Sequence, residues 1–373
     1  MNTGPDNRPA TPANPERPAV SVAIPTRGRP HHIRACLLAL QAQHAPDDPP
    51  FEVIVVTDGP DPETDRVCLS FTPAAPMTVR LIRADHLGNA HAKNIALGAA
   101  RAPLFVMLND DVRPANGFLA AHRSAHAERS TPAMVLGWSP WVTHHPDRLF
   151  DRLVRETSMI FFYDRMVSRT GEPLEAPHHD WGYRHAWTLN LSVPTEAARA
   201  VSGFNPGLAN CCFEDVEFGR RFALAHAAPL LFRPDTLAPH DHRYEPAAYL
   251  AREFRLGYSA WALAHLAPDC AREIFRRDLT APHELARARE LVNGGETDAG
   301  AAEHAWFHTL AHHPAEGIGP DGSPEAAATL AALYQRHLPL KRREFARGLL
   351  AAERGETIEG LHPLRAPAAV SQA

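Results

Sequence analysis

The chain has 373 residues, 45% of them hydrophobic, and its 38 basic and 43 acidic side chains give a formal net charge of −5. This length and apolar content suffice for one large or two modest globular domains. The charge balance offers no global positive field, so it argues against nucleic acid as a partner, although it is compatible with a local basic pocket.

The cysteines and the apolar runs indicate the compartment. Five cysteines are scattered without CxxC spacing or a disulfide framework, which favours a reducing cytosol: Cys36, Cys68, Cys211, Cys212 and Cys270. No apolar run approaches the roughly 20 residues that span a bilayer, and the N-terminus lacks a hydrophobic signal core. We therefore expect a cytoplasmic protein with no transmembrane segment, at most peripheral to the inner face of a membrane.

Strands and helices are expected to alternate through the first part of the chain. The apolar pattern predicts strands and helices, in chain order, at 20–24, 33–40, 51–56, 79–82, 90–100 and 104–108. Near-continuous apolar strands that alternate with helices are typical of a parallel sheet covered on both faces. Ligands of such sheets lie beyond the carboxyl ends of the strands.

The rest of the chain has a different character. Residues 1–18 are rich in proline and small polar residues and predict a disordered tail, because they have too little apolar surface to offset ordering. Residues 138–187 are aromatic and irregular, a pattern that fits either a wall of a substrate site or core packing. Helical spacing after Pro246 predicts amphipathic core helices, with further helical stretches near 283–292 and 324–352. The expected division is therefore a tail, an α/β domain over 19–245 and a helical extension over 246–373, for which a homodimer contact is an alternative to simple packing.

The apolar strand 104–108 ends abruptly in Asn109, Asp110 and Asp111. Carboxylates at the end of a buried strand commonly hold a divalent cation, and an ordinary turn is the alternative. Other polar residues, Thr26, Arg29 and Asp58, also fall at expected strand ends. The strand ends are therefore the candidate site.

Four segments in chain order resemble the inverting family 2 glycosyltransferases. They are residues 22–29 (VAIPTRGR), 53–59 (VIVVTDG), 88–96 (GNAHAKNIA) and 109–114 (NDDVRP), and the whole resemblance covers roughly residues 20–245. It implies the type A glycosyltransferase fold, a Rossmann-like and mostly parallel sheet. It also implies an enzyme that moves a sugar from a nucleotide-diphosphate sugar to an acceptor hydroxyl with inversion.

The resemblance assigns the first two segments to the nucleotide. Pro25, Thr26 and Arg29 would lie against the base and the diphosphate, and Asp58 would accept hydrogen bonds from a base edge such as uracil, so a UDP-sugar is the favoured donor. Thr57 stands where the family usually has another acid. An Asp-Gly turn after a strand is the alternative explanation of Asp58.

The third and fourth segments supply the phosphate and metal residues that the resemblance implies. Lys93 replaces the arginine of the family, which exchanges a bidentate phosphate contact for a point charge, and a solvated helix lysine is the alternative. Asn94 would order the loop near the acidic strand end. Asp111 would bind Mn²⁺ or Mg²⁺, and Asp110 would bond the ribose hydroxyl or a metal-bound water. Asn109 departs from the first acid of the family motif.

Residues 190–193, 203–205 and 213–221 resemble the acceptor side of the same family. By this resemblance Asp215 is the general base for the acceptor hydroxyl, and Glu214 orients the acceptor or the donor sugar. The alternative is an acid pair that caps a helix N-terminus and interacts favourably with its dipole.

A histidine pair follows the strand-like residues 230–232, roughly where the family places a histidine that completes the metal shell. His240 is favoured over His242 because it is nearer the strand end. A neutral imidazole suits Mn²⁺ better than Mg²⁺. The overall hypothesis requires Asp58, Asp111 and Asp215 to converge on one cleft.

Other functions stay open at this point. A sugar-phosphate nucleotidyltransferase would need a glycine-rich triphosphate loop after the first strand, where Gly28 stands alone. A noncatalytic nucleotide-sugar-binding protein is favoured by the departures at Thr57, Lys93 and Asn109. A metallohydrolase built on the histidine pair leaves the first hundred residues unexplained. For a transferase, the acceptor could be a saccharide, a lipid-linked substrate or a small molecule.

Overall fold

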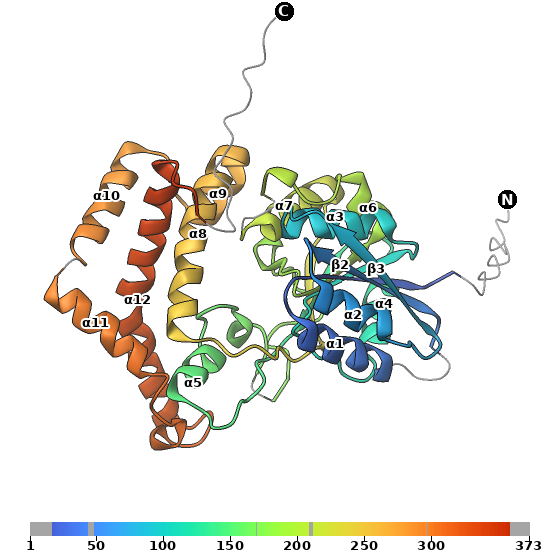
Figure 1. Ribbon diagram of the computed structural model, residues 1–373, viewed down its shortest axis with the longest axis horizontal. Coiled ribbons are helices and arrows are strands. Elements are labelled where there is room, and N and C mark those ends of the chain that lie inside the picture. The colour runs from blue at the N-terminus through green and yellow to red at the C-terminus, as the bar shows by residue number, and fades with distance from the viewer. Residues whose placement is uncertain (1–16, 44–47, 169, 209–211, 296, 359–373) are drawn as a thin grey trace, which may run out of the picture.

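The computed structural model describes residues 17–43, 48–168, 170–208, 212–295 and 297–358. A part that contains the sheet and a part made of helices lie next to each other (Figure 1). Residues 1–16 of the expected tail lie outside the described residues, as does Cys211.

The sheet that the described residues form has seven strands in the order β3-β2-β1-β4-β6-β5-β7. Their bounds are β1 (Val20–Thr26), β2 (Phe51–Asp58), β3 (Met77–Ala84), β4 (Leu104–Leu108), β5 (Met134–Trp138), β6 (Asn190–Pro194) and β7 (Leu230–Leu237). β1 is parallel to β2 and β4, and β2 to β3, whereas β6 is antiparallel to both of its neighbours. The expected mostly parallel α/β fold with a helical C-terminal region is confirmed.

Six helices cover the two faces of the sheet. Figure 1 shows α3 (Asn89–Ala99), α6 (Thr195–Ala200) and α7 (Glu214–His226) over one face, and α1 (Pro30–Ala42), α2 (Pro62–Ser70) and α4 (Phe118–Ala127) over the other. Both faces of the sheet need cover because β1, β2 and β4 are buried along almost their whole length. The largest apolar core lies between these layers, with fully buried side chains such as Ile24, Val55, Phe105, Phe218 and Phe222.

The helical part contains α5 (Leu149–Glu156), α8 (Pro246–Leu266), α9 (Pro268–Phe275), α10 (Pro282–Asn293), α11 (Asp298–Thr309) and α12 (Pro324–Glu353). Short 3-10 turns lie at Tyr163–Arg165, Tyr183–His185, Pro206–Leu208 and Ala315–Ile318. No helix among the described residues is both long enough and apolar enough to cross a membrane.

Two glycines let α8 and α12 pack with their backbones close together. A Cβ on Gly257 would lie 1.8 Å from the carbonyl oxygen of Phe345, and one on Gly348 would lie 1.9 Å from that of Phe254. Any larger residue would therefore force the two helices apart. α12 also continues through Pro339, so a proline alone does not end this helix.

A second core joins the helices that follow Pro246 to α5. Phe150 and Leu153 of α5 pack with Tyr249, Phe307 and Leu330. The C-terminal helices therefore recruit an element from within residues 19–245, and the division at residue 245 stays a prediction.

Candidate active site

The expected site residues lie at the carboxyl edge of the sheet. β1 lies between β2 and β4, and the three strands run in the same direction. Their carboxyl ends therefore bring Thr26, Asp58 and Asp110 to the same edge.

The acid pair after β4 is held by the turn that follows β1. Thr26 donates from Oγ1 to Asp110 Oδ2 at 2.6 Å, and Arg29 Nη1 donates to Asp110 Oδ1 at 3.1 Å and Asp111 Oδ2 at 2.6 Å. The Arg29 side chain is 38% exposed, whereas those of Asp110 and Asp111 are 6% and 4% exposed. Burial and the neighbouring charge of Asp111 raise the pKa of Asp110. The pair thus forms an anionic site whose counter-charge is open to solvent.

Backbone pairing brings the histidine segment to Asp111. Asp241 N donates to Asp111 O at 2.7 Å, which lays this segment along the chain that leaves β4. On its other side the backbone of His240 bonds to Pro140 and Val142. The main chain of His240 is thereby fixed on both sides by backbone hydrogen bonds.

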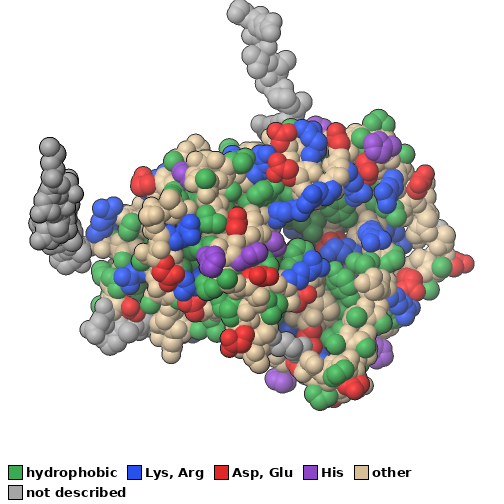
Figure 2. All heavy atoms as spheres, turned by 180° about the vertical axis from the view of Figure 1, so that it is seen from behind, with side chains coloured by type: hydrophobic (Ala, Val, Ile, Leu, Met, Phe, Trp, Pro, Cys, Tyr) green, Lys and Arg blue, Asp and Glu red, His purple; other side chains and the backbone are tan. Residues whose placement is uncertain are grey.

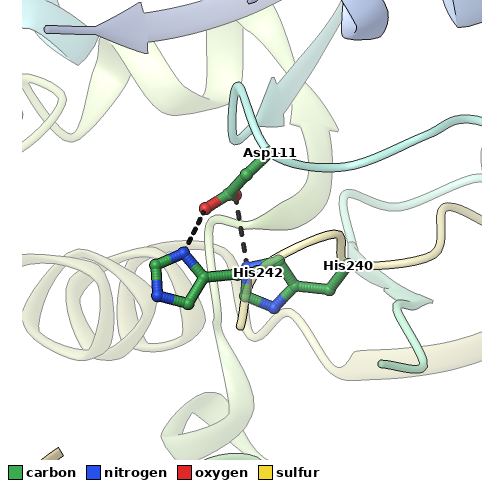
Figure 3. A group of neighbouring side chains, drawn as sticks. All are labelled: Asp111, His240 and His242. Atoms are coloured by element: carbon green, nitrogen blue, oxygen red, sulfur yellow. Dashed lines mark ion pairs between the residues drawn. The ribbon is translucent and has the colours of Figure 1, made fainter. Parts of the chain in front are cut away.

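Asp111, His240 and His242 could hold a metal ion. His240 Nε2 lies 3.2 Å from Asp111 Oδ1, and His242 Nδ1 lies 3.3 Å from Asp111 Oδ2 (Figure 3). The three candidate ligand atoms lie within 4.8 Å of one another. Trp141 stacks on the His240 ring at 4.4 Å between centroids. A carboxylate and two imidazoles are a donor set that suits a divalent transition metal.

The electrostatics of this trio favour an ionised carboxylate. Burial would raise the pKa of Asp111, but the adjacent imidazoles of His240 and His242, together with Arg29, hold it well below its usual range. A carboxylate that stays ionised is the form that binds a cation.

Asp58 anchors the glycine loop before α3. Its Oδ1 accepts hydrogen bonds from Leu87 N at 3.0 Å and Gly88 N at 3.1 Å, and His86 Nδ1 lies 3.2 Å from its Oδ2. Gly88 has φ of 95°, a conformation that favours glycine. His86 also contacts Arg27 Nη1 at 3.0 Å, which ties this loop to the turn after β1. The expected contact of Asp58 with a base stays a prediction.

The acid pair at the start of α7 has a buried cation as its partner. Glu214 Oε1 accepts hydrogen bonds from Lys93 Nζ at 2.8 Å and from Asn89 Nδ2 at 3.0 Å. Lys93 Nζ also donates to Thr188 Oγ1 at 2.6 Å. The Lys93 side chain is only 2% exposed. The phosphate contact expected of Lys93 stays a prediction, and the structure gives this lysine a protein partner.

Asp215 is the second residue of α7 and is partly buried. Its Oδ1 accepts a hydrogen bond from Val216 N at 2.7 Å. Burial and the charge of Glu214 raise the pKa of Asp215 to about 7. A carboxylate that titrates near neutrality is suited to act as a general base.

Asn94 orders the loop that leads to α7. Its Nδ2 donates to Phe204 O at 2.8 Å, and its Oδ1 accepts from Phe204 N at 2.7 Å. The Phe204 ring stacks on Phe218 of α7 at 4.5 Å. Asn94 therefore links α3 to α7, and a contact of Asn94 with a ligand stays a prediction.

A chain of contacts runs between the segments that carry the three expected acids, whereas the convergence of these acids on one cleft stays a prediction. From Asp58 it runs through Gly88 N and then through the side-chain amide of the adjacent Asn89 to Glu214, the neighbour of Asp215. From Glu214 it continues through Lys93 to Thr188, and Asn109 N, beside the Asp110–Asp111 pair, donates to Leu189 O at 3.2 Å. On the exposed surface, Lys and Arg side chains gather around a recess near the middle of the face in Figure 2.

Several residues that shape the site had no assigned role in the sequence. Asn89 lies within a segment that resembles the family, so its position gave a signal. Thr188 and Trp141 lie in irregular aromatic sequence, and His86 lies in a short loop. Their roles come from neighbours distant in the chain, which no local pattern reports.

Residues 21–190 match the family model described as "Glycosyl transferase family 2". A validoxylamine A glucosyltransferase of Streptomyces hygroscopicus subsp. limoneus is 28% identical over 252 residues, which cover 61% of this chain and 53% of that protein. A pre-mycofactocin glycosyltransferase of Mycobacterium tuberculosis is 27% identical over 269 residues, which cover 70% and 51%. The chain thus spans about half the length of these curated relatives.

Among solved structures, a mannosyltransferase from Pyrobaculum calidifontis in complex with GDP-Man and Mn²⁺ has a TM-score of 0.49 and 19% sequence identity, over 91% of this chain and 86% of that chain. The family match includes Asp58, Lys93 and the Asp110–Asp111 pair. It ends before α7 and the histidine segment, so the roles of those residues depend on the geometry above.

Proposed function

We propose that this chain, whose residues 21–190 match the family 2 glycosyltransferase model, transfers a sugar from a nucleotide-diphosphate sugar to an acceptor hydroxyl, with inversion at the anomeric carbon. The observation that carries the proposal is a pair of acid sites connected by contacts. One offers a carboxylate and two imidazoles to a metal, and the other offers Asp215, whose pKa is raised to about 7.

The donor would bind at the carboxyl ends of β1, β2 and β4. We assign Asp58 to contact with the base, for which we favour uracil, and Asp110 to contact with the ribose. Pro25 and Thr26 shape the turn beside the nucleotide. Arg29 is half-exposed and lies beside both acids, so it can place its positive charge against the diphosphate.

Asp111, His240 and His242 would hold the metal ion. We favour Mn²⁺ over Mg²⁺, because two of the three side chains are imidazoles. When bound, such a cation neutralises negative charge on the departing diphosphate.

The acceptor would bind on the side of α7. Asp215 takes the proton from the attacking hydroxyl, and Glu214 orients a sugar beside it. An attack in line with the departing diphosphate inverts the anomeric carbon in one displacement, and correct alignment supplies much of the acceleration. Saccharides, lipid-linked acceptors and small molecules remain candidates for the acceptor, and location in the cytoplasm or at the inner membrane face remains part of the proposal.

A thermal-shift panel of nucleotide diphosphates and their sugars, each with and without Mn²⁺, tests the donor site. A ligand that binds the native state raises the melting temperature. We expect a UDP-sugar with Mn²⁺ to give the largest rise. A panel in which no nucleotide sugar stabilises the protein would contradict the proposal.

Hydrolysis of the stabilising donor then separates an enzyme from a noncatalytic binding protein. We expect slow release of free sugar in the presence of Mn²⁺, with the anomeric configuration inverted. Stabilisation by the donor without hydrolysis or transfer to any acceptor would favour the noncatalytic alternative.

A further inference from the structure

Lys93 carries a positive charge into the interior beside α7. Its side chain is 2% exposed, and its ammonium lies between Thr188 Oγ1 at 2.6 Å and Glu214 Oε1 at 2.8 Å. The ring of Phe204 lies 5.1 Å from Nζ. These contacts turn the lysine toward the protein, where a buried ammonium is stable only if it is paired.

Glu214 is fixed from two sides. Asn89 Nδ2 donates to the same Oε1 at 3.0 Å, so the carboxylate accepts from two donors that both belong to α3. Glu214 is only 4% exposed. The direction of its carboxylate is therefore set by Lys93 and Asn89, and Glu214 stands directly beside Asp215 in the chain.

We propose that Lys93 is a positioning residue for the transfer: together with Asn89 it fixes the direction of the Glu214 carboxylate, and it places this buried ion pair directly beside Asp215. The proposal rests on the proposed function, in which Asp215 is the general base. It assigns Lys93 to the acceptor side of the site.

The charges around Asp215 support this assignment. Burial raises the pKa of Asp215 most, Glu214 raises it further, and Lys93 acts in the opposite direction. The pKa of the Cys212 thiol is raised to about 11, so this thiol is uncharged at neutral pH, and Glu217 of the same helix is paired with Arg221 at 2.6 Å.

Arg252 of α8 is a further cation near Cys212. It is paired with Glu253 at 2.8 Å, and its charge acts on Cys212. After burial, the charges that act on Asp215 are those of the Lys93–Glu214 pair. A lysine suits this position because its compact ammonium fits between two oxygens.

The first experiment is the pH profile of kcat/KM for the full chain with the donor that the panel selects. For Glu214→Gln we expect the acid limb to move to lower pH by about one pH unit, because a negative neighbour is removed. For Lys93→Met we expect a move to higher pH, because Glu214 is left uncompensated. The double variant removes both charges, and its acid limb should return close to that of the wild type.

The chain offers a control in Lys341, which is partly buried and lies 3.9 Å from the buried Glu253. Lys341→Met should leave the acid limb in place. Lys93→Arg keeps the charge, so it should keep the acid limb close to that of the wild type. If Lys93→Met does not fold, Glu214→Gln and the double variant decide the question.

A second readout needs no substrate. The carboxyl carbon of Asp215 can be titrated by NMR in protein labelled at aspartate, with Asp215→Asn to identify its signal. The midpoint should move in the same directions in the variants. Unmoved midpoints in both Glu214→Gln and Lys93→Met would overturn the proposal. If the wild type transfers no sugar but the midpoints move, the proposed function fails while the role of the ion pair in setting Asp215 stands.

Discussion

Two pairs of adjacent acids contribute to the candidate site, Asp110–Asp111 and Glu214–Asp215, and they are neutralised in different ways. Asp110 and Asp111 share Arg29, which is 38% exposed. Glu214 is paired with Lys93, which is 2% exposed. The first counter-charge can move aside for a ligand, whereas the second is part of the interior. Two similar acid pairs can thus differ: one has a counter-charge that a ligand can displace, and the other has a counter-charge that is fixed in the interior.

The protonation of the two pairs differs accordingly. His240 and His242 hold the pKa of Asp111 well below its usual range despite its burial, whereas burial and Glu214 raise the pKa of Asp215 to about 7. Asp111 therefore stays ionised as a ligand, while Asp215 can take up and release a proton. Environments that push two carboxyl groups apart in this way are typical of sites with separate chemical roles.

The largest effect is expected for a substitution of Asp215, the second acid of the pair at the start of α7. Asp215→Asn should lower kcat by about 10³-fold, because a general base contributes roughly that much, while the donor-induced thermal shift stays unchanged. Asp269→Asn is the control, since Asp269 is an exposed acid in the first turn of α9. Near-normal turnover in Asp215→Asn would remove Asp215 from the mechanism and leave only a helix-capping role.

The difference in burial between the two counter-charges predicts a difference in stability. Lys93→Met should lower the free energy of unfolding by about 3–5 kcal/mol, because Glu214 is left buried without its partner. Arg29→Met should cost about 1 kcal/mol or less, since this pair is partly exposed. Urea unfolding measures both. Equal losses of unfolding free energy in the two variants would show that the burial of the counter-charge does not distinguish the two pairs.

Substitution of the expected metal ligands tests the role of the Asp110–Asp111 pair. Asp111→Asn should weaken Mn²⁺ binding by roughly 100-fold or more, seen as loss of the Mn²⁺-induced thermal shift. His240→Gln should have a larger effect than His242→Gln, because His240 is held by backbone hydrogen bonds and by Trp141. An unchanged Mn²⁺ shift in Asp111→Asn would place the metal elsewhere.

The smallest effect on kcat is expected from a change of pH alone. Asp215 must be ionised to accept a proton, so the reaction is fully active above its pKa of about 7 and loses activity as the pH falls through it. At saturating Mn²⁺ and donor, kcat at pH 6 should be about tenfold lower than at pH 8. A flat profile between these values would contradict a base that titrates near neutrality.

Local pattern was enough to predict much of the sheet. The apolar run at 104–108 coincides with β4, and the runs at 20–24 and 51–56 lie within β1 and β2. Buried parallel strands appear as continuous apolar segments, so their composition reports them. The direction of β6 was not predictable in the same way, because alternation of side chains is the same in parallel and antiparallel strands.

The candidate site shows the same limit. The positions of the acids and of the histidine pair were visible in the sequence, since charged residues directly after apolar runs stand out. The partner of Lys93 was not, because Glu214 is 121 residues away. A lysine in a helix has the same local pattern whether it faces solvent, a phosphate or a buried carboxylate.

The amino-acid sequence by itself determined where the strands form, which acids follow them and which family the chain resembles, because these depend on neighbours in the chain. Tertiary structure alone decided that α5 joins the C-terminal helices, that Trp141 packs on His240 and that Lys93 is buried against Glu214. Burial and charge pairing are properties of groups that meet only after folding, and they separate the chemistry of the two acid pairs.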